Sequence, residues 1–257
     1  MSFIFDTYIP GHSLLHKLDP RVKLLGTAFT LMLVFWLPGL ALQCLFLGVL
    51  HIILLCAGIP GSRILNLWRQ MAVLLVLIMV LQPLFLPAGD LLLKLGPLRL
   101  TTGGILDALR LAVRASGFAF AMAVLLTTTD HHALVLAFVR MGLPYTWGLT
   151  ISLALRFLPA IHSMFHAVKD AQAARGWLFS GGVFQRLRDY LPVLIAVIVG
   201  TLRMSDQLTL ALAARGLGTP TRRTRWRDLH MRRSDWLCAL GLASAFVAFI
   251  WWRAIIY

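Results

Sequence analysis

Two short stretches of the sequence carry residue types that suit docking to another protein. They are Ala171-Gln172-Ala173-Ala174-Arg175-Gly176 and Ala211-Leu212-Ala213-Ala214-Arg215-Gly216, which are identical at five of six positions and lie 40 residues apart. The alanines let another backbone approach closely, each arginine offers forked, permanently charged donors to a carboxylate, and each glycine can end a helix. One copy alone would be interpreted as a helix C-terminus with a cation near its dipole. Two near-identical copies favour a pair of docking sites.

Two histidines offer a second kind of chemistry, because imidazole nitrogens bind transition metals. His162 and His166 are four residues apart, and Asp170 follows four residues later, so a helix would place the three on one face. Position 163 is a serine, and the glutamate of the zinc motif H-E-x-x-H is therefore absent. We favour a polar helix face over a metal site at these residues.

Three charged residues begin the segment 105–127, which is otherwise apolar. Asp107, Arg110 and Arg114 are spaced by three and four residues, so they share one face of a helix. Charged side chains near the end of a membrane span usually pair with one another or extend to the interface. A substrate or ion role for the three is the less favoured interpretation.

Several known site patterns are absent from the sequence. No stretch matches the phosphate-binding loop G-x-x-x-x-G-K-[ST], the nucleophile elbow G-x-S-x-G, or an aspartate-rich pair for magnesium and pyrophosphate. Cys44, Cys56 and Cys238 lie in apolar runs without a CxxC pair, which argues against a zinc site or structural disulfide. The basic run 222–233 contains one stacking aromatic residue, Trp226, which favours attachment to anionic lipid over nucleic acid.

The composition identifies the class of protein that must position these residues. Hydrophobic residues make up 59% of the 257 residues and charged residues 13%, whereas soluble domains are about 45–50% apolar and about 25% charged. The mean hydropathy is +0.82. The first 19 residues lack the basic, apolar and small-residue regions of a signal peptide. We therefore predict an integral membrane protein.

Apolar runs predict five membrane-spanning helices, at residues 22–37, 40–57, 71–86, 105–127 and 236–252. Asp19 and Asp130 are expected N-caps, the first with proline following at the first helical position. Residues 91–100 are expected to form a short interfacial hairpin, and 62–70 a loop. The predicted fold is therefore an all-α membrane protein with about five transmembrane helices and a cytoplasmic or interfacial helical region.

Positive charge predicts the orientation. Residues 130–235 hold 14 basic and six acidic residues, and such an excess marks the cytoplasmic side. Four spans before this region place the N-terminus in the cytoplasm as well. We expect two long helices here, starting near Pro159 and Pro192 and ending at the Arg-Gly motifs. The alternative is that residues 145–161 and 191–210 form a further transmembrane hairpin.

The order of several short motifs resembles the transmembrane T component of energy-coupling factor transporters, which are ATP-driven importers of vitamins and transition metals. The resemblance covers nearly the whole chain. The resemblance rests on the following motifs: Tyr8-Ile9-Pro10-Gly11, Ser13-Leu14-Leu15-His16-Lys17-Leu18-Asp19-Pro20-Arg21, Thr128-Thr129-Asp130, Leu155-Arg156-Phe157-Leu158-Pro159 and the two Ala-Arg-Gly motifs, the second followed by Leu217-Gly218. Each motif alone is weak, but the set in this order is specific.

The resemblance implies a scaffold that links a substrate-binding membrane subunit, the S component, to two cytosolic ABC ATPase subunits. Residues 1–129 would be a four-span bundle, 130–235 the coupling-helix region and 236–257 the last span. The ATPases would bind Ala174, Arg175 and Gly176 at one motif, and Ala214, Arg215 and Gly216 at the other.

On this view the chain is no enzyme and holds no cofactor, since the ATPases bind the ATP. It would lie in a bacterial or archaeal plasma or inner membrane. The cargo stays open among cobalt, nickel, biotin and other vitamins, and so does a dedicated or shared energy-coupling module.

Two other functional classes remain possible at this point. A membrane enzyme or ion carrier would use Asp107, Arg110 and Arg114, or the pair of His162 and His166. A passive membrane anchor would bind a cytosolic complex without moving cargo.

Overall fold

The computed structural model describes residues 8–256, apart from 12, 38, 86–90, 96–97, 178–181 and 218–230. Contacts divide the chain into two units. The first, which we call the helical bundle, comprises Ile4–Gly142 and Leu229–Tyr257, and the second, which we call the crossed pair, is built on Leu143–Asp228 together with Met1–Phe3. The basic segment 222–227 lies outside the described residues.

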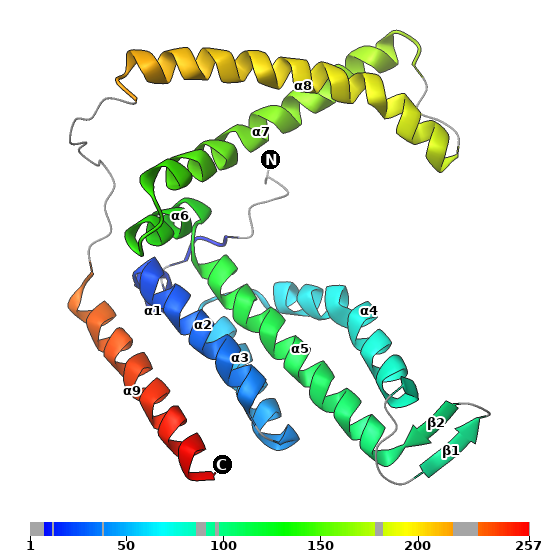
Figure 1. The fold of residues 1–257 in the computed structure, drawn as a ribbon, viewed down its shortest axis with the longest axis vertical. Helices are drawn as coiled ribbons and strands as arrows, with labels where there is room; N and C mark the ends of the chain where they lie inside the picture. The colour runs from blue at the N-terminus through cyan, green and yellow to red at the C-terminus, as the bar shows by residue number, and fades with distance from the viewer. Residues whose placement is uncertain are drawn as a thin grey trace. The chain divides into compact units, whose positions relative to one another are not determined.

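The helical bundle is arranged around one long helix, α5 (Figure 1). Helices α2, α3 and α4 each pack against α5, whereas α9 packs against α2. The elements of the bundle are α1 (Leu14–Lys17), α2 (Pro20–Trp36), α3 (Leu40–Cys56), α4 (Gly61–Phe85), β1 (Leu91–Leu95), β2 (Leu98–Thr101), α5 (Thr102–Thr128), α6 (His131–Arg140) and α9 (Arg233–Ile256). The prediction of an all-α membrane protein is confirmed, and the two short strands belong to a single hairpin.

A buried aromatic cluster joins α3, α4 and α5. Phe120 is fully buried, and its ring centroid lies 4.3 Å from that of His51 and 5.2 Å from that of Trp68. The indole nitrogen of Trp68 donates to Nε2 of His51 over 3.0 Å. Because that nitrogen accepts, Nδ1 carries the proton and donates to the Leu47 carbonyl over 2.8 Å. A neutral, fully paired histidine can therefore lie within this apolar core.

The predicted helix starts are confirmed where local chemistry determines them. The Asp19 carboxylate accepts from the backbone N–H of Arg21 over 2.9 Å, with Pro20 at the first position of α2. Asp130 caps α6 by accepting from His132 over 3.3 Å. Leu91–Leu95 and Leu98–Thr101 form the strands of the expected hairpin and pair antiparallel, with Leu95 opposite Leu98.

One carboxylate joins the starts of two helices that are far apart in sequence. Asp235 is 1% exposed, and its oxygens accept from the backbone N–H of Asp19 over 3.1 Å and of Arg232 over 2.7 Å. These donors lie at the N-termini of α2 and α9, where the helix dipoles favour a negative charge. Lys23, itself buried, donates from Nζ to the Thr128 carbonyl over 2.9 Å and adds a nearby positive charge.

Five described helices are long and apolar enough to cross a membrane, namely α4, α5, α7, residues 187–214 of α8, and residues 233–251 of α9. The predicted number of five is confirmed, but the set contains α7 and α8 in place of α2 and α3. The segment 62–70 is the first part of α4 rather than a loop. Helices α2 and α3 have 17 residues each, about 25 Å at 1.5 Å per residue, which is shorter than the ~30 Å hydrocarbon core.

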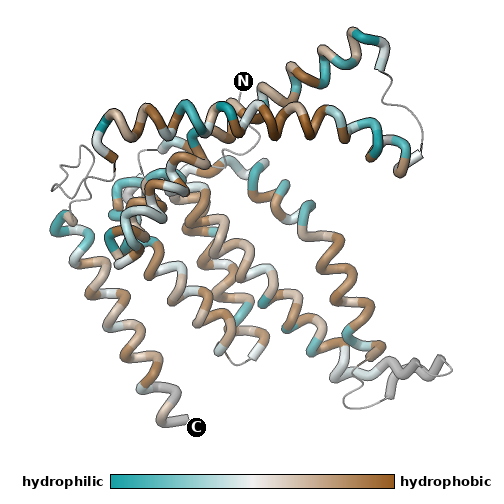
Figure 2. Tube along the Cα trace, turned by 45° about the horizontal axis from the view of Figure 1, so that its top comes forward, coloured by the Kyte–Doolittle hydropathy of each residue, from teal (hydrophilic) through white to brown (hydrophobic). Residues whose placement is uncertain are grey.

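The crossed pair consists of α7 (Tyr145–Ala174) and α8 (Val183–Ala214). Both helices continue through their prolines, Pro159 and Pro192, so the prediction that they begin near these residues is wrong. An internal proline removes one backbone hydrogen bond and strains the helix, but the residues on both sides of Pro159 and Pro192 remain helical. Figure 2 shows the apolar middle of α8 between more hydrophilic ends.

A small core holds the crossed pair together. Val193 is fully buried and Val197 nearly so, and the rings of Phe165 and Tyr190 stack with centroids 6.2 Å apart. A Cβ added to Gly200 would meet the Met164 sulfur at 2.7 Å. The absence of a side chain at Gly200 therefore lets α8 approach Met164 of α7 closely.

Cysteine labelling will show whether α7 crosses the membrane. In a background without Cys44, Cys56 and Cys238, a cysteine in place of the exposed Ala171 near the end of α7 should be protected from an impermeant thiol reagent in intact cells, as positive charge in this region predicts. Thr102→Cys, at the start of α5, should react. Rapid labelling at position 171 from outside would favour the transmembrane hairpin instead.

Candidate partner-docking site

The first Ala-Arg-Gly motif ends α7 in a Schellman turn. The backbone N–H of Gly176 donates to the carbonyl of Ala173 over 3.0 Å, and that of Trp177 to Gln172 over 3.1 Å. Gly176 has φ +81°, a conformation that costs residues with a Cβ about 1–2 kcal/mol. The glycine is therefore required by the backbone at this position, as the sequence predicts.

The second motif ends α8 with nearly the same geometry. Gly216 donates to Ala213 over 2.9 Å, and Leu217 to Leu212 over 2.9 Å, while Gly216 has φ +75°. These are the two hydrogen bonds that define a Schellman motif. Nearly identical sequences thus produce nearly identical helix ends at two places.

Each arginine occupies the C-cap position of its helix. Arg175 has φ −84° and ψ 11°, and Arg215 has φ −86° and ψ 10°, so the two backbones aim their side chains alike. Both residues are exposed. No carboxylate among the described residues forms an ion pair with either guanidinium.

The surface next to each arginine is small and open. Ala174 and Ala214 are exposed, and a Cβ added at Gly176 would meet no atom within 4 Å. A partner could therefore approach each helix end closely and offer a carboxylate to the guanidinium, which can bind it with two parallel hydrogen bonds.

The two motifs lie on opposite sides of the helix crossing (Figure 1). The crossing is marked by Met164 on α7 and Gly200 on α8. Arg175 follows Met164 by 11 residues and Arg215 follows Gly200 by 15, which at 1.5 Å per residue is about 16 and about 22 Å along the helices. The unit therefore presents two separate sites rather than one composite site.

The histidine pair does not gather a third metal ligand. His162 and His166 are exposed, with ring centroids 4.6 Å apart. The described residues contain no group of three or more histidine, cysteine or acidic side chains able to hold a metal ion. The preference for a polar helix face over a metal site at these residues stays a prediction.

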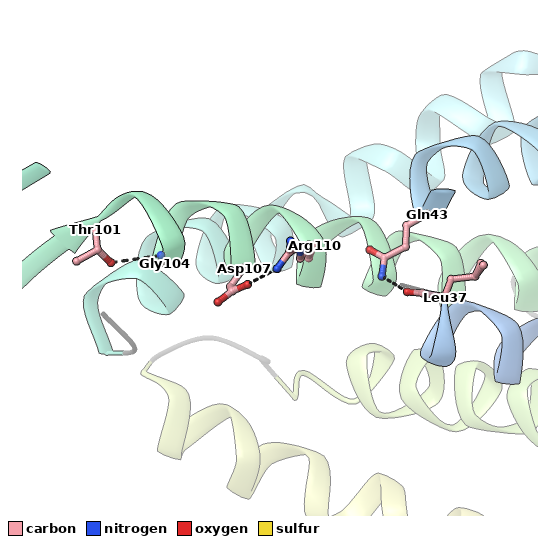
Figure 3. A network of polar contacts seen from close by, with 6 residues as sticks. All are labelled: Leu37, Gln43, Thr101, Gly104, Asp107 and Arg110. Carbon is pink, nitrogen blue, oxygen red and sulfur yellow. Dashed lines mark hydrogen bonds and ion pairs between the residues drawn. The ribbon is translucent and has the colours of Figure 1, made fainter. Parts of the chain in front are cut away.

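On the charged face of α5, Asp107 neutralises one of the two arginines. Arg110 donates to Asp107 over 3.0 Å (Figure 3), and both side chains are nearly half exposed. The guanidinium carbon of Arg114 lies 5.5 Å from the centre of the Phe35 ring. The three residues lie on one helix, as predicted, without a further acidic side chain bonded to them among the described residues.

Sequence reasoning missed the buried carboxylate of Asp235. Its partner Asp19 is 216 residues away, and nothing local distinguishes a lone aspartate in the first turn of an apolar helix from an ordinary helix-start residue. The only available signal was its place beside an apolar run.

Changing Gly176 to valine should weaken the α7 site without touching Arg175. Open space surrounds the position, so the cost is backbone strain of about 1–2 kcal/mol, or roughly a 5–30-fold loss in binding of a partner that requires this helix end. Gly182→Ala is the matched control, since Gly182 has φ −66° and open surroundings. Titration of the partner against both variants would measure this, and equal affinities would contradict it.

Comparison with known proteins matches the chain along nearly its whole length. The family model described as cobalt transport protein, CbiQ, matches residues 11–226, which include both motifs. The energy-coupling factor transporter transmembrane protein EcfT of Thermosediminibacter oceani is 31% identical over 262 residues, covering 95% of this chain and 97% of the relative. EcfT of Streptococcus equi subsp. equi is 29% identical and covers 92% and 91%.

A longer relative has a different name. A putative ABC transporter ATP-binding protein of Bifidobacterium longum is 32% identical over 250 residues, which cover 94% of this chain but 32% of the relative. The present chain therefore spans about a third of the length of that protein.

Proposed function

The chain belongs to the cobalt transport protein family, CbiQ, and is an EcfT-like multi-pass membrane component of an energy-coupling transporter; from this premise we propose that it is the scaffold that docks two cytosolic ABC ATPase subunits. Arg175 would contact one ATPase and Arg215 the other. The observation that carries the proposal is the pair of matching helix ends, each with an exposed arginine that has no described carboxylate partner.

The duplicated geometry supports two partners of one kind. Each end has the same Schellman turn and the same C-cap backbone, so one type of acidic groove fits both. The opposite placement of the ends about the crossing leaves room for two separate subunits. The Bifidobacterium relative adds support, since a segment similar to nearly all of this chain occurs within a protein named as ATP-binding.

Cargo recognition is assigned to another membrane subunit in this proposal. The described residues offer no group of three metal ligands, and the sequence has no nucleotide-binding loop. We propose that an S component binds a vitamin or a transition metal ion, and that this chain relays the ATPase motion to it. The N-terminus and the crossed pair would face the cytoplasm of a bacterial or archaeal cell.

Purification of single and combined components tests this function. The isolated chain in detergent should neither hydrolyse ATP nor bind cargo tightly. Cells that produce the chain with two ATPase subunits and an S component encoded nearby should import cargo, and omission of this chain should abolish uptake. ATP turnover by the clean isolated chain would exclude the scaffold, and partner binding without any uptake would indicate a passive anchor.

A further inference from the structure

Two arginines in the first half of α5 lie outside the two Ala-Arg-Gly motifs. Arg110 and Arg114 are one helical turn apart on an apolar helix that is long enough to cross the membrane. Asp107 pairs with Arg110, so the group of three carries one net positive charge. A charged side chain inside a membrane span is costly and usually marks a functional contact.

Arg114 lies beside the corner between α2 and α3. Its guanidinium lies over the ring of Phe35, the next-to-last residue of α2. Gln43, which is 5% exposed, holds this corner by donating from Nε2 to the Leu37 carbonyl over 3.0 Å (Figure 3). Both α2 and α3 therefore have their ends near the level of Arg114, while α5 continues about 18 Å further toward Thr102.

Polar atoms at this level lack partners. The Nε atoms of Arg110 and Arg114 and the Oε1 atom of Gln43 are buried without a hydrogen bond. Neighbouring leucines on the same turns of α5, Leu106, Leu109 and Leu111, are 38–42% exposed. Guanidinium donors next to exposed apolar side chains match a ligand with an anionic head and a hydrocarbon tail.

The short length of α2 would allow the head of such a ligand to approach the two arginines. Helix α2 has 17 residues, so it spans about 25 Å and ends about 5 Å short of crossing a ~30 Å hydrocarbon core. A lipid headgroup beside a short helix can be drawn inward, because mismatch is relieved by local thinning or by extended basic side chains. Arg114 lies at one end of this short helix, over Phe35.

We propose that Arg110 and Arg114 bind the phosphodiester of a membrane phospholipid at the α2–α3 corner. The forked donors of arginine fit phosphate oxygens, and one phosphodiester charge balances the net charge of the three side chains. The acyl chains would lie along Leu106 and Leu109. A free phosphate ion shares the head chemistry but would leave these apolar side chains uncovered.

The test is native mass spectrometry of the full-length chain, purified in detergent and titrated with dioleoylphosphatidylglycerol. The affinity of the tightest lipid site should fall about tenfold or more in the double variant Arg110→Gln/Arg114→Gln, which loses the charge-assisted hydrogen bonds. Arg69→Gln, at an exposed arginine on α4, is the matched control and should retain wild-type affinity. Arg110→Lys/Arg114→Lys should fall between.

A variant that is expected to bind lipid more tightly than wild type distinguishes a specific loss of binding from misfolding. Asp107→Asn keeps both arginines, removes the competing carboxylate and should tighten the site about threefold or more, because a neutral amide no longer competes for Arg110. Inorganic phosphate should not displace the lipid at tenfold excess, and displacement would identify free phosphate as the ligand and overturn the lipid site. Equal lipid affinity in wild type, Asp107→Asn and the double glutamine variant would also overturn it.

Discussion

Replacement of both Arg175 and Arg215 by glutamate should abolish co-purification of the ATPase subunits and abolish uptake, although the chain still inserts and folds. Both side chains are exposed helix C-caps without a described carboxylate partner, so their charge is available to a partner. Truncating one member of a desolvated charge pair typically costs 2–5 kcal/mol, and much of this arises from the charge left unpaired. Either single glutamate variant should weaken recruitment tens-fold or more.

The chemistry of the replacement distinguishes docking from helix capping. Arg→Lys retains the charge but loses the forked geometry. Its recruitment of the ATPases should therefore be weaker than that of wild type but stronger than that of Arg→Ala. If the arginines only complemented the helix dipoles, their loss would cost about 0.3–1 kcal/mol and leave assembly intact. Arg203→Glu, at an exposed position on the same helix α8, is the matched control at equal membrane expression.

The second large effect is expected on stability, at Asp235. Asp235→Ala should lower the free energy of unfolding by about 3–5 kcal/mol, as expected when one partner of a buried charge group is removed. The change leaves the backbone N–H groups of Asp19 and Arg232 unpaired and removes a negative charge beside Lys23. Helix α9 should then detach from α2 at lower temperature.

Thermal unfolding in detergent, followed by circular dichroism, would measure this effect. Asp235→Asn should be milder than alanine, because its amide oxygen still accepts one hydrogen bond. Asp206→Ala, at an exposed aspartate of α8, should leave the melting temperature within about 1–2 °C of wild type, as surface substitutions usually do. A melting temperature for Asp235→Ala equal to that of Asp206→Ala would contradict the bridging role.

Features determined by local chemistry were predictable from the sequence. The ends of α7 and α8 fall at Gly176 and Gly216 because only glycine adopts their left-handed backbone without cost. The starts of α2 and α6 follow from the aspartates that cap them. The order of residues alone therefore suffices to place both Ala-Arg-Gly motifs at helix ends.

Features determined by distant contacts or by helix context could not be predicted in the same way. Prolines at 159 and 192 suggested helix starts, but one continuous helix runs through each of them. Arg63 and Arg69 suggested a loop, yet they lie on exposed turns of α4. The bond between Asp235 and the start of α2 depends on how the bundle folds, and no local pattern encodes it.

Photo-crosslinking from the helix ends tests the central claim most directly. A photoreactive amino acid would replace Trp177 or Leu217, each of which follows an Arg-Gly pair and is exposed, in cells that produce the whole complex. Phe85, exposed at the end of α4, provides the control. The docking account predicts an ATPase crosslink from both 177 and 217 and none from 85. Absence of any ATPase crosslink from 177 and 217, at wild-type complex yield, would contradict it.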